Sequence, residues 1–116
     1  MELKFIPQNP VRKFEVGIQK TILSDCGNVE LQKDEQITIL RNSGAEFDFV
    51  AKEWGFYATP SVNGRLVKFG LRTAVVLNNR TGKRFILVLE KGFEDSFFKY
   101  LKAESMEVER WLDEDD

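Results

Sequence analysis

Hydrophobic and polar residues alternate along most of the chain, which is the pattern of β-strands with one buried face. Phe14 and Val16, for example, alternate with Lys13 and Glu15. The same alternation, or a short apolar run between turn residues, recurs at residues 29–31, 36–40, 46–50, 54–58, 65–69, 71–77 and 83–90. The pattern therefore predicts many short strands.

Turn residues separate these segments. Pro7 and Pro10 are expected to end any strand that begins before them. Residues 24–28, Ser-Asp-Cys-Gly-Asn, are typical of a turn. Residues 63–64, Asn-Gly, favour a hairpin in which 65–69 returns antiparallel. A second hairpin is predicted at 71–90, where two apolar arms flank a loop rich in Asn and Gly.

The period changes after Gly92. Phe93, Phe97 and Leu101 are spaced as one face of an amphipathic helix, expected over about 93–104. Alternation then returns and predicts a last strand over 106–112. The acidic residues 113–116 are expected to form a frayed tail.

These elements indicate a mainly β or α+β fold within a single domain, residues 1–116. We expect an antiparallel barrel or sandwich of about 7–9 strands, covered by the one C-terminal helix. As an alternative, strand 83–90, the helix and strand 106–112 form one βαβ crossover in a two-layer α+β sheet.

Charge is distributed unevenly along the chain. Between Glu53 and Glu90 there are six lysines and arginines and no acidic residue, whereas the segment from Glu90 onward is strongly acidic. The first part of the basic block also contains aromatic residues and glycines, a mixture suited to an anionic or planar ligand. The candidate ligand-binding residues are Trp54, Tyr57, Asn63, Arg65, Lys68 and Arg72.

The same basic block has simpler interpretations. Two strands with a solvated basic face give the same composition, and the acidic end can pair with the block within one chain or across a dimer. A nucleic-acid partner is not expected, because the pI of about 5.3 lacks the basic excess of such domains. Trp111 alternates onto the charged side of its strand and is a candidate partner contact.

The composition excludes much chemistry. The chain has no histidine and one cysteine, Cys26, so histidine-dependent catalysis, a cysteine cluster and an internal disulfide are excluded. We expect no metal and no cofactor. No segment has the length of a membrane span, so no membrane partner and a cytoplasmic location are expected.

Three functional hypotheses follow. The first is a small binding or accessory module, dimeric, whose segment 54–72 contacts an anionic ligand or an acidic protein surface. The second is a histidine-independent enzyme acting on an anionic substrate through Glu46, Asp48 or Tyr57, with Arg65 as anchor. The third is a structural subunit that docks another protein, because ten phenylalanines are many for one small core.

Overall fold

The computed structural model describes residues 4–114, and most of them are in β-structure. The strands form three small antiparallel sheets with the orders β1-β2, β3-β4-β5 and β7-β6-β8. In chain order the elements are β1 (Lys4–Val16), β2 (Thr21–Glu30), β3 (Gln36–Leu40), β4 (Glu46–Lys52), β5 (Gly55–Ala58), α1 (Arg65–Lys68), β6 (Leu71–Asn78), β7 (Arg84–Glu90), α2 (Glu94–Ala103) and β8 (Met106–Trp111). The predicted β-rich fold with a C-terminal helix and a last strand is confirmed.

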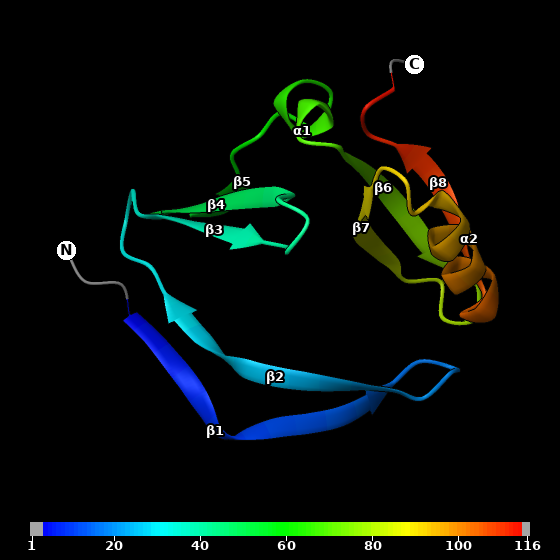
Figure 1. Ribbon diagram of the computed structural model, residues 1–116, viewed down its shortest axis with the longest axis horizontal. Helices are drawn as coiled ribbons and strands as arrows, with labels where there is room; N and C mark the ends of the chain where they lie inside the picture. Colours follow the sequence, from blue (N-terminus) through cyan, green and yellow to red (C-terminus); the bar gives the residue numbers. More distant parts are fainter. Residues whose placement is uncertain (1–3, 115–116) are drawn as a thin grey trace.

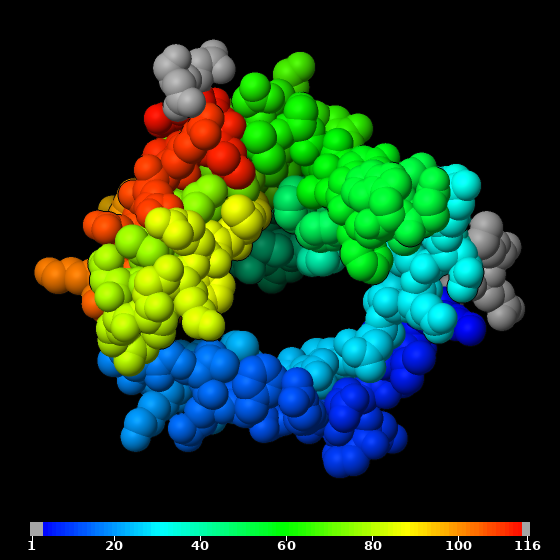
Figure 2. Space-filling view, turned by 180° about the vertical axis from the view of Figure 1, so that it is seen from behind, coloured from blue at the N-terminus to red at the C-terminus, as the bar shows by residue number. Residues whose placement is uncertain are grey.

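The three sheets surround a central opening (Figure 1). The hairpin of β1 and β2 forms one side, and the other two sheets form the rest (Figure 1). Figure 2 shows the opening from behind, with the hairpin in blue across its lower edge. The expectation of a closed barrel or a sandwich is wrong. Because β1 and β2 pair only with each other, the first strands cannot close a barrel with the later ones.

The hydrophobic core is small and divided into two clusters. One consists of Ala45, Leu66 and Leu71, with Phe47 and Val88 packed against it. This cluster joins the β3-β4-β5 sheet to α1 and to the β7-β6-β8 sheet, and Leu66 is 0% exposed. The second lies between the β7-β6-β8 sheet and α2, around the buried residues Ala74, Val76 and Leu101.

The β7-β6-β8 sheet is the best-packed part of the chain. β7 and β8 are both antiparallel to β6, so they run parallel to each other with β6 between them. α2 connects them and contacts both. The predicted 71–90 hairpin is confirmed. The alternative prediction is a βαβ crossover made of strand 83–90, the helix and strand 106–112. The β7-α2-β8 connection resembles this crossover, with β6 lying between the two parallel strands.

Three local predictions are wrong. β1 continues through Pro7 and Pro10, and its pairing with β2 is interrupted only between Pro7 and Arg12. This is possible because β1 is an edge strand. On its outer side no neighbouring strand accepts hydrogen bonds, so a proline without an N–H loses none there. Residues 24–28 are part of β2 rather than a turn. Residues 65–68 form α1 instead of a returning strand. The chain turns into α1 with the Arg65 N–H donating to Ser61 Oγ at 2.9 Å and the Leu66 N–H donating to the Ser61 carbonyl at 3.1 Å.

Candidate functional site

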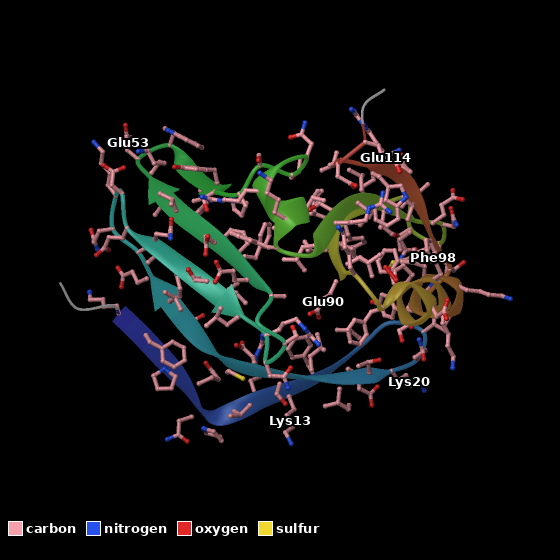
Figure 3. All side chains as sticks on the ribbon, turned by 45° about the horizontal axis from the view of Figure 1, so that its top comes forward. Lys13, Lys20, Glu53, Glu90, Phe98 and Glu114 are labelled. Atoms are coloured by element: carbon pink, nitrogen blue, oxygen red, sulfur yellow. The ribbon has the colours of Figure 1, made fainter. Side chains whose placement is uncertain are left out.

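The most unusual feature of the molecule is the hairpin formed by residues 4–30, called the arm from here on. It comprises β1, the turn 17–20 and β2, and none of its residues is buried. Within residues 4–114 the arm packs extensively on no other helix or strand. Figure 3 shows side chains projecting from both faces of the arm, with Lys13 near its middle. An isolated two-stranded hairpin is at best marginally stable in water, so the arm needs further contacts to keep its shape.

The arm carries many exposed hydrophobic side chains. Phe14 lies directly opposite Leu23, and Phe5 directly opposite Val29, so apolar pairs extend along the hairpin. Such pairs normally stabilise a sheet by packing on a core. The exposed large apolar residues of the arm are Phe5, Ile6, Val11, Phe14, Val16, Ile18, Ile22, Leu23 and Val29.

One carboxylate fastens the tip of the arm. Glu104 follows the last residue of α2, and its Oε1 and Oε2 accept hydrogen bonds from the backbone N–H groups of Ile18 (2.7 Å) and Gln19 (3.0 Å). We call this pair of bonds the latch. Glu104 is only 3% exposed. The bond from Gln19, then that from Ile18, holds the pKa of Glu104 below its ordinary value of 4.5, and the nearby charge of Arg80 acts in the same direction.

Gly17 makes the latch possible. It has φ +78°, a conformation that glycine adopts without strain, and a Cβ atom there would overlap the Glu104 carboxylate. The turn therefore brings backbone, rather than a side chain, against Glu104.

Two apolar cavities lie along the opening. The larger, about 570 Å³, lies between the arm tip and the β7-α2 region, where Val16 and Leu23 face Phe85 and Tyr100 across it. The smaller, about 400 Å³, lies between β3-β4 and β7-α2. Its lining includes Ile39, Phe47, Val88, Phe93, Phe97 and Tyr100. Both cavities have predominantly apolar walls.

Each sheet turns one edge strand toward the opening. These inner edges are β2, β3 and β7 (Figure 1). None of the three contains proline, whereas the outer strand of the arm, β1, contains Pro7 and Pro10. Proline on an edge prevents further strand pairing, so the outer edge of the arm is protected and the inner edges are open.

Glu90, the last residue of β7, links the β7-β6-β8 sheet to the connection between β3 and β4, beside the smaller cavity. Its carboxylate accepts a hydrogen bond from Arg41 Nε at 3.0 Å and another from Ser43 Oγ. Figure 3 shows Glu90 at the end of β7, beside the opening. The walls of the opening are thus joined by this carboxylate on one side and by the latch on the other.

The predicted ligand residues are not gathered around one pocket. Trp54 and Tyr57 are stacked with ring centroids 6.2 Å apart, and both are exposed, Trp54 by 66%. Arg65 instead donates a hydrogen bond to Thr59 Oγ1 at 3.1 Å and lies over the Phe69 ring. Asn63 and Lys68 are exposed at the two ends of the α1 turn.

Arg72 has its partners within the chain. Its Nε bonds Asp113 at 2.9 Å, another nitrogen bonds Glu114 at 3.0 Å, and the guanidinium lies 3.9 Å from the Trp111 ring centroid. The predicted partner contact, Trp111, is therefore the surface on which Arg72 packs. The pairing of basic block and acidic end within one chain, one of the sequence interpretations, is what the structure shows here. Of the predicted frayed tail, residues 115 and 116 lie outside the described residues.

The two carboxylates of the enzyme hypothesis have different surroundings, because Glu46 lines the smaller cavity and Asp48 does not. Asp48 is buried and accepts a hydrogen bond from Thr59 Oγ1 at 3.4 Å, while Thr59 in turn accepts one from Arg65. This short chain ties β4 to α1. Within residues 4–114 no group of three or more acidic, cysteine or histidine residues is arranged to hold a metal ion, and no helix is long and apolar enough to cross a membrane.

Sequence reasoning missed Glu104, and a signal for it exists. An acidic side chain at the C-terminal end of a helix opposes the helix dipole, so its presence there indicates a second role. The groups that Glu104 binds are backbone N–H groups of a distant turn, and a pattern of side chains does not reveal backbone partners. Comparison with known proteins adds no further assignment: no protein-family model, no curated protein and no solved structure matches the chain.

Proposed function

We propose that this chain is a structural subunit that binds another protein chain through its arm. The observation that carries the proposal is the arm itself, a hairpin of residues 4–30 with exposed apolar side chains along its length and little packing on the rest of the molecule. Contiguous apolar surface on this scale is typical of protein-binding sites. The single exposed thiol, Cys26, fits a reducing compartment such as the cytoplasm.

The geometry supports docking in two ways. Apolar side chains on both faces of the arm provide the buried area that drives association. The open inner edges β2, β3 and β7 offer backbone N–H and C=O groups for pairing with an added strand. An assembly role uses both features, whereas a small-molecule site uses neither.

Photo-crosslinking tests the docking role without knowledge of the partner. A benzophenone amino acid replaces Ile22 or Leu23, which lie on opposite faces of the arm. The full chain is expressed in the cell that naturally makes it and is irradiated there. We expect covalent protein adducts from at least one of these two positions.

Lys99 is the matched control, because it is exposed on α2 and lies outside the arm. The same amino acid at Lys99 should give few adducts or none. If neither arm position gives more adduct than Lys99, the docking role is wrong. The mass of each adduct distinguishes a second copy of this chain from a different protein.

A second candidate function rests on the exposed stack of Trp54 and Tyr57. Two parallel aromatic faces in solvent, with Arg65 and Lys68 on the neighbouring α1, favour a planar or anionic small ligand. A thermal-shift screen against nucleotides, sugar phosphates and dicarboxylates tests it. A ligand that raises the melting temperature of the wild type and not of Trp54→Ala supports this site, and no shift with any of them rejects it.

A further inference from the structure

We propose that the partner of the arm is a second copy of this chain, and that two copies exchange their arms so that each tip is latched by Glu104 of the other. This inference rests on the proposed docking role and names its partner. Exchange of an identical element is a low-cost route to a dimer, because contacts already present within one chain form again between two.

The exposed area indicates a missing chain of substantial size. The accessible surface is 8510 Å² for a chain of 13.4 kDa. A compact monomer of this mass exposes about 6,500 Å², so the excess is about 2,000 Å². The radius of gyration, 15.9 Å, likewise exceeds the roughly 13 Å of a compact domain of this length.

This excess matches the contribution of one subunit to an obligate homodimer. Such interfaces bury about 2,000–5,000 Å² in total, half of it from each chain. A brief contact with an unrelated protein buries far less. Since the two subunits of a homodimer expose the same surface, one self-complementary contact covers the excess on both.

The arm is attached in a way that permits exchange. Residues 31 and 32 after β2 have no regular secondary structure. From Gln32 onward the chain is held to the body, because the Gln32 N–H donates to Glu35 Oε1 and the Asp34 N–H donates to the Ala51 carbonyl at 2.7 Å. On the other side the tip is held by the latch. Rotation of the chain at residue 31 therefore moves the arm as a unit and leaves these contacts in place.

The contacts at the tip are equally good between chains. The latch uses backbone N–H groups of one element and a carboxylate of another, and Val16 and Leu23 face the wall containing Phe85. A second copy supplies all of these groups unchanged. The exchanged dimer adds contacts between the two arms and the two bodies, which one chain lacks.

Crosslinking between differently labelled copies tests exchange directly. Two variants are made in a Cys26→Ser background, one with Thr21→Cys on the arm and one with Arg80→Cys on the opposite wall of the larger cavity. The Arg80→Cys chain is labelled with ¹⁵N. The two are unfolded together, refolded and treated with a short bismaleimide, and any link from residue 21 to residue 80 necessarily joins two chains.

We expect a dimeric mass in sedimentation and a 21–80 link well above the background of a Lys99→Cys control on α2. A third variant carries Thr21→Cys and Arg80→Cys in the same chain. A dimer without a link between the single-cysteine chains, or a monomer in which only this double variant is linked, overturns arm exchange. A third outcome separates the two proposals. If the purified chain is a monomer and photo-crosslinking joins the arm to a different protein, the docking role stands, but the proposal that the partner is a second copy of this chain is wrong. Circular dichroism of each variant verifies folding. In the wild type, dilution to the monomer should reduce the protection of the Ile18 and Gln19 amides from hydrogen exchange, and unchanged protection in a chain that has become monomeric overturns exchange.

Discussion

Glu104 binds the backbone of Ile18 across 86 residues of sequence, with 2.7 Å between Oε1 and the amide nitrogen. This bond and its neighbour from the Gln19 N–H attach the arm tip to the residue that follows α2. The attachment of the arm tip through these two bonds therefore depends on one side chain. That dependence makes the latch the most accessible feature to test.

Substitution of Glu104 should release the arm tip in two steps. Glutamine keeps the length of the side chain and one acceptor oxygen, so Glu104→Gln retains one of the two bonds, while Glu104→Ala retains neither. We expect hydrogen exchange of the Ile18 and Gln19 amides to accelerate by about tenfold for each bond lost. The amide of Val76 in β6 is the internal control, and equal protection of the tip in all three proteins would contradict the latch.

The latch should weaken in acid. The bonds from Gln19 and Ile18 lower the pKa of Glu104, so the carboxylate binds its proton more weakly when the arm is docked. The stabilisation is therefore complete above the ordinary value of 4.5 and is lost as the pH falls through the lowered, docked value. Protection of the tip amides, corrected for intrinsic exchange, should show this loss in the wild type. In Glu104→Gln the acid-dependent loss should be absent.

Arg72 should contribute more to stability than the other arginines of the basic block. Its side chain is about one quarter exposed and combines two carboxylate partners with the face of Trp111. We expect Arg72→Ala to lower the free energy of unfolding by about 2 kcal/mol and Arg72→Lys by about 1 kcal/mol, measured by urea denaturation. Arg84→Ala is the matched control, because Arg84 also bonds a carboxylate but is largely exposed. An equal loss in both alanine variants would argue against a special role for the Trp111 contact.

Leu66 should be the most sensitive position of α1. It is fully buried where α1, β4 and the β7-β6-β8 sheet meet. Leu66→Ala is expected to cost about 2–5 kcal/mol of unfolding free energy, since it removes packing and leaves a cavity. Leu40→Ala, at a position 66% exposed, should change stability little. If the two leucines cost the same, α1 does not anchor the two sheets.

The C-terminal half of the fold was accessible from the sequence because its signals are local. The alternation of 71–77 and 83–90, and the spacing of Phe93, Phe97 and Leu101, reflect packing on one contiguous core. Each of these elements has a buried face, so the spacing of its hydrophobic residues in the sequence correctly predicts a strand or a helix.

The alternation at Phe14 and Val16 correctly predicted a strand, but the separation of the arm from the other sheets was not accessible from the sequence, for the opposite reason. The arm has no buried face within residues 4–114, so its pattern describes a surface that the single chain does not cover. Pro7 and Pro10 signal a strand end only if both edges of the strand must pair, and here one edge is free. The barrel expectation failed for the same reason, because it assumed that all strands share one core.

The candidate ligand site was predictable only in part. Proximity in sequence correctly grouped Trp54 with Tyr57, which are three residues apart and stack. Arg72 belongs to the same segment, yet its partners Asp113 and Glu114 lie more than 40 residues further on. A charge pattern shows that a basic block and an acidic end exist, but only the fold decides which residues meet.

The separation between the arm and its anchor has a consequence for synthesis. The arm is made before its anchor, because Glu104 is translated 86 residues after Ile18. Synthesis proceeds at about 5–20 residues per second, so the apolar side chains of the arm remain without their anchor for several seconds. During that interval nascent arms on neighbouring ribosomes are available to one another and to chaperones. The order in which the residues are made thus places a period of high aggregation risk before the latch can close.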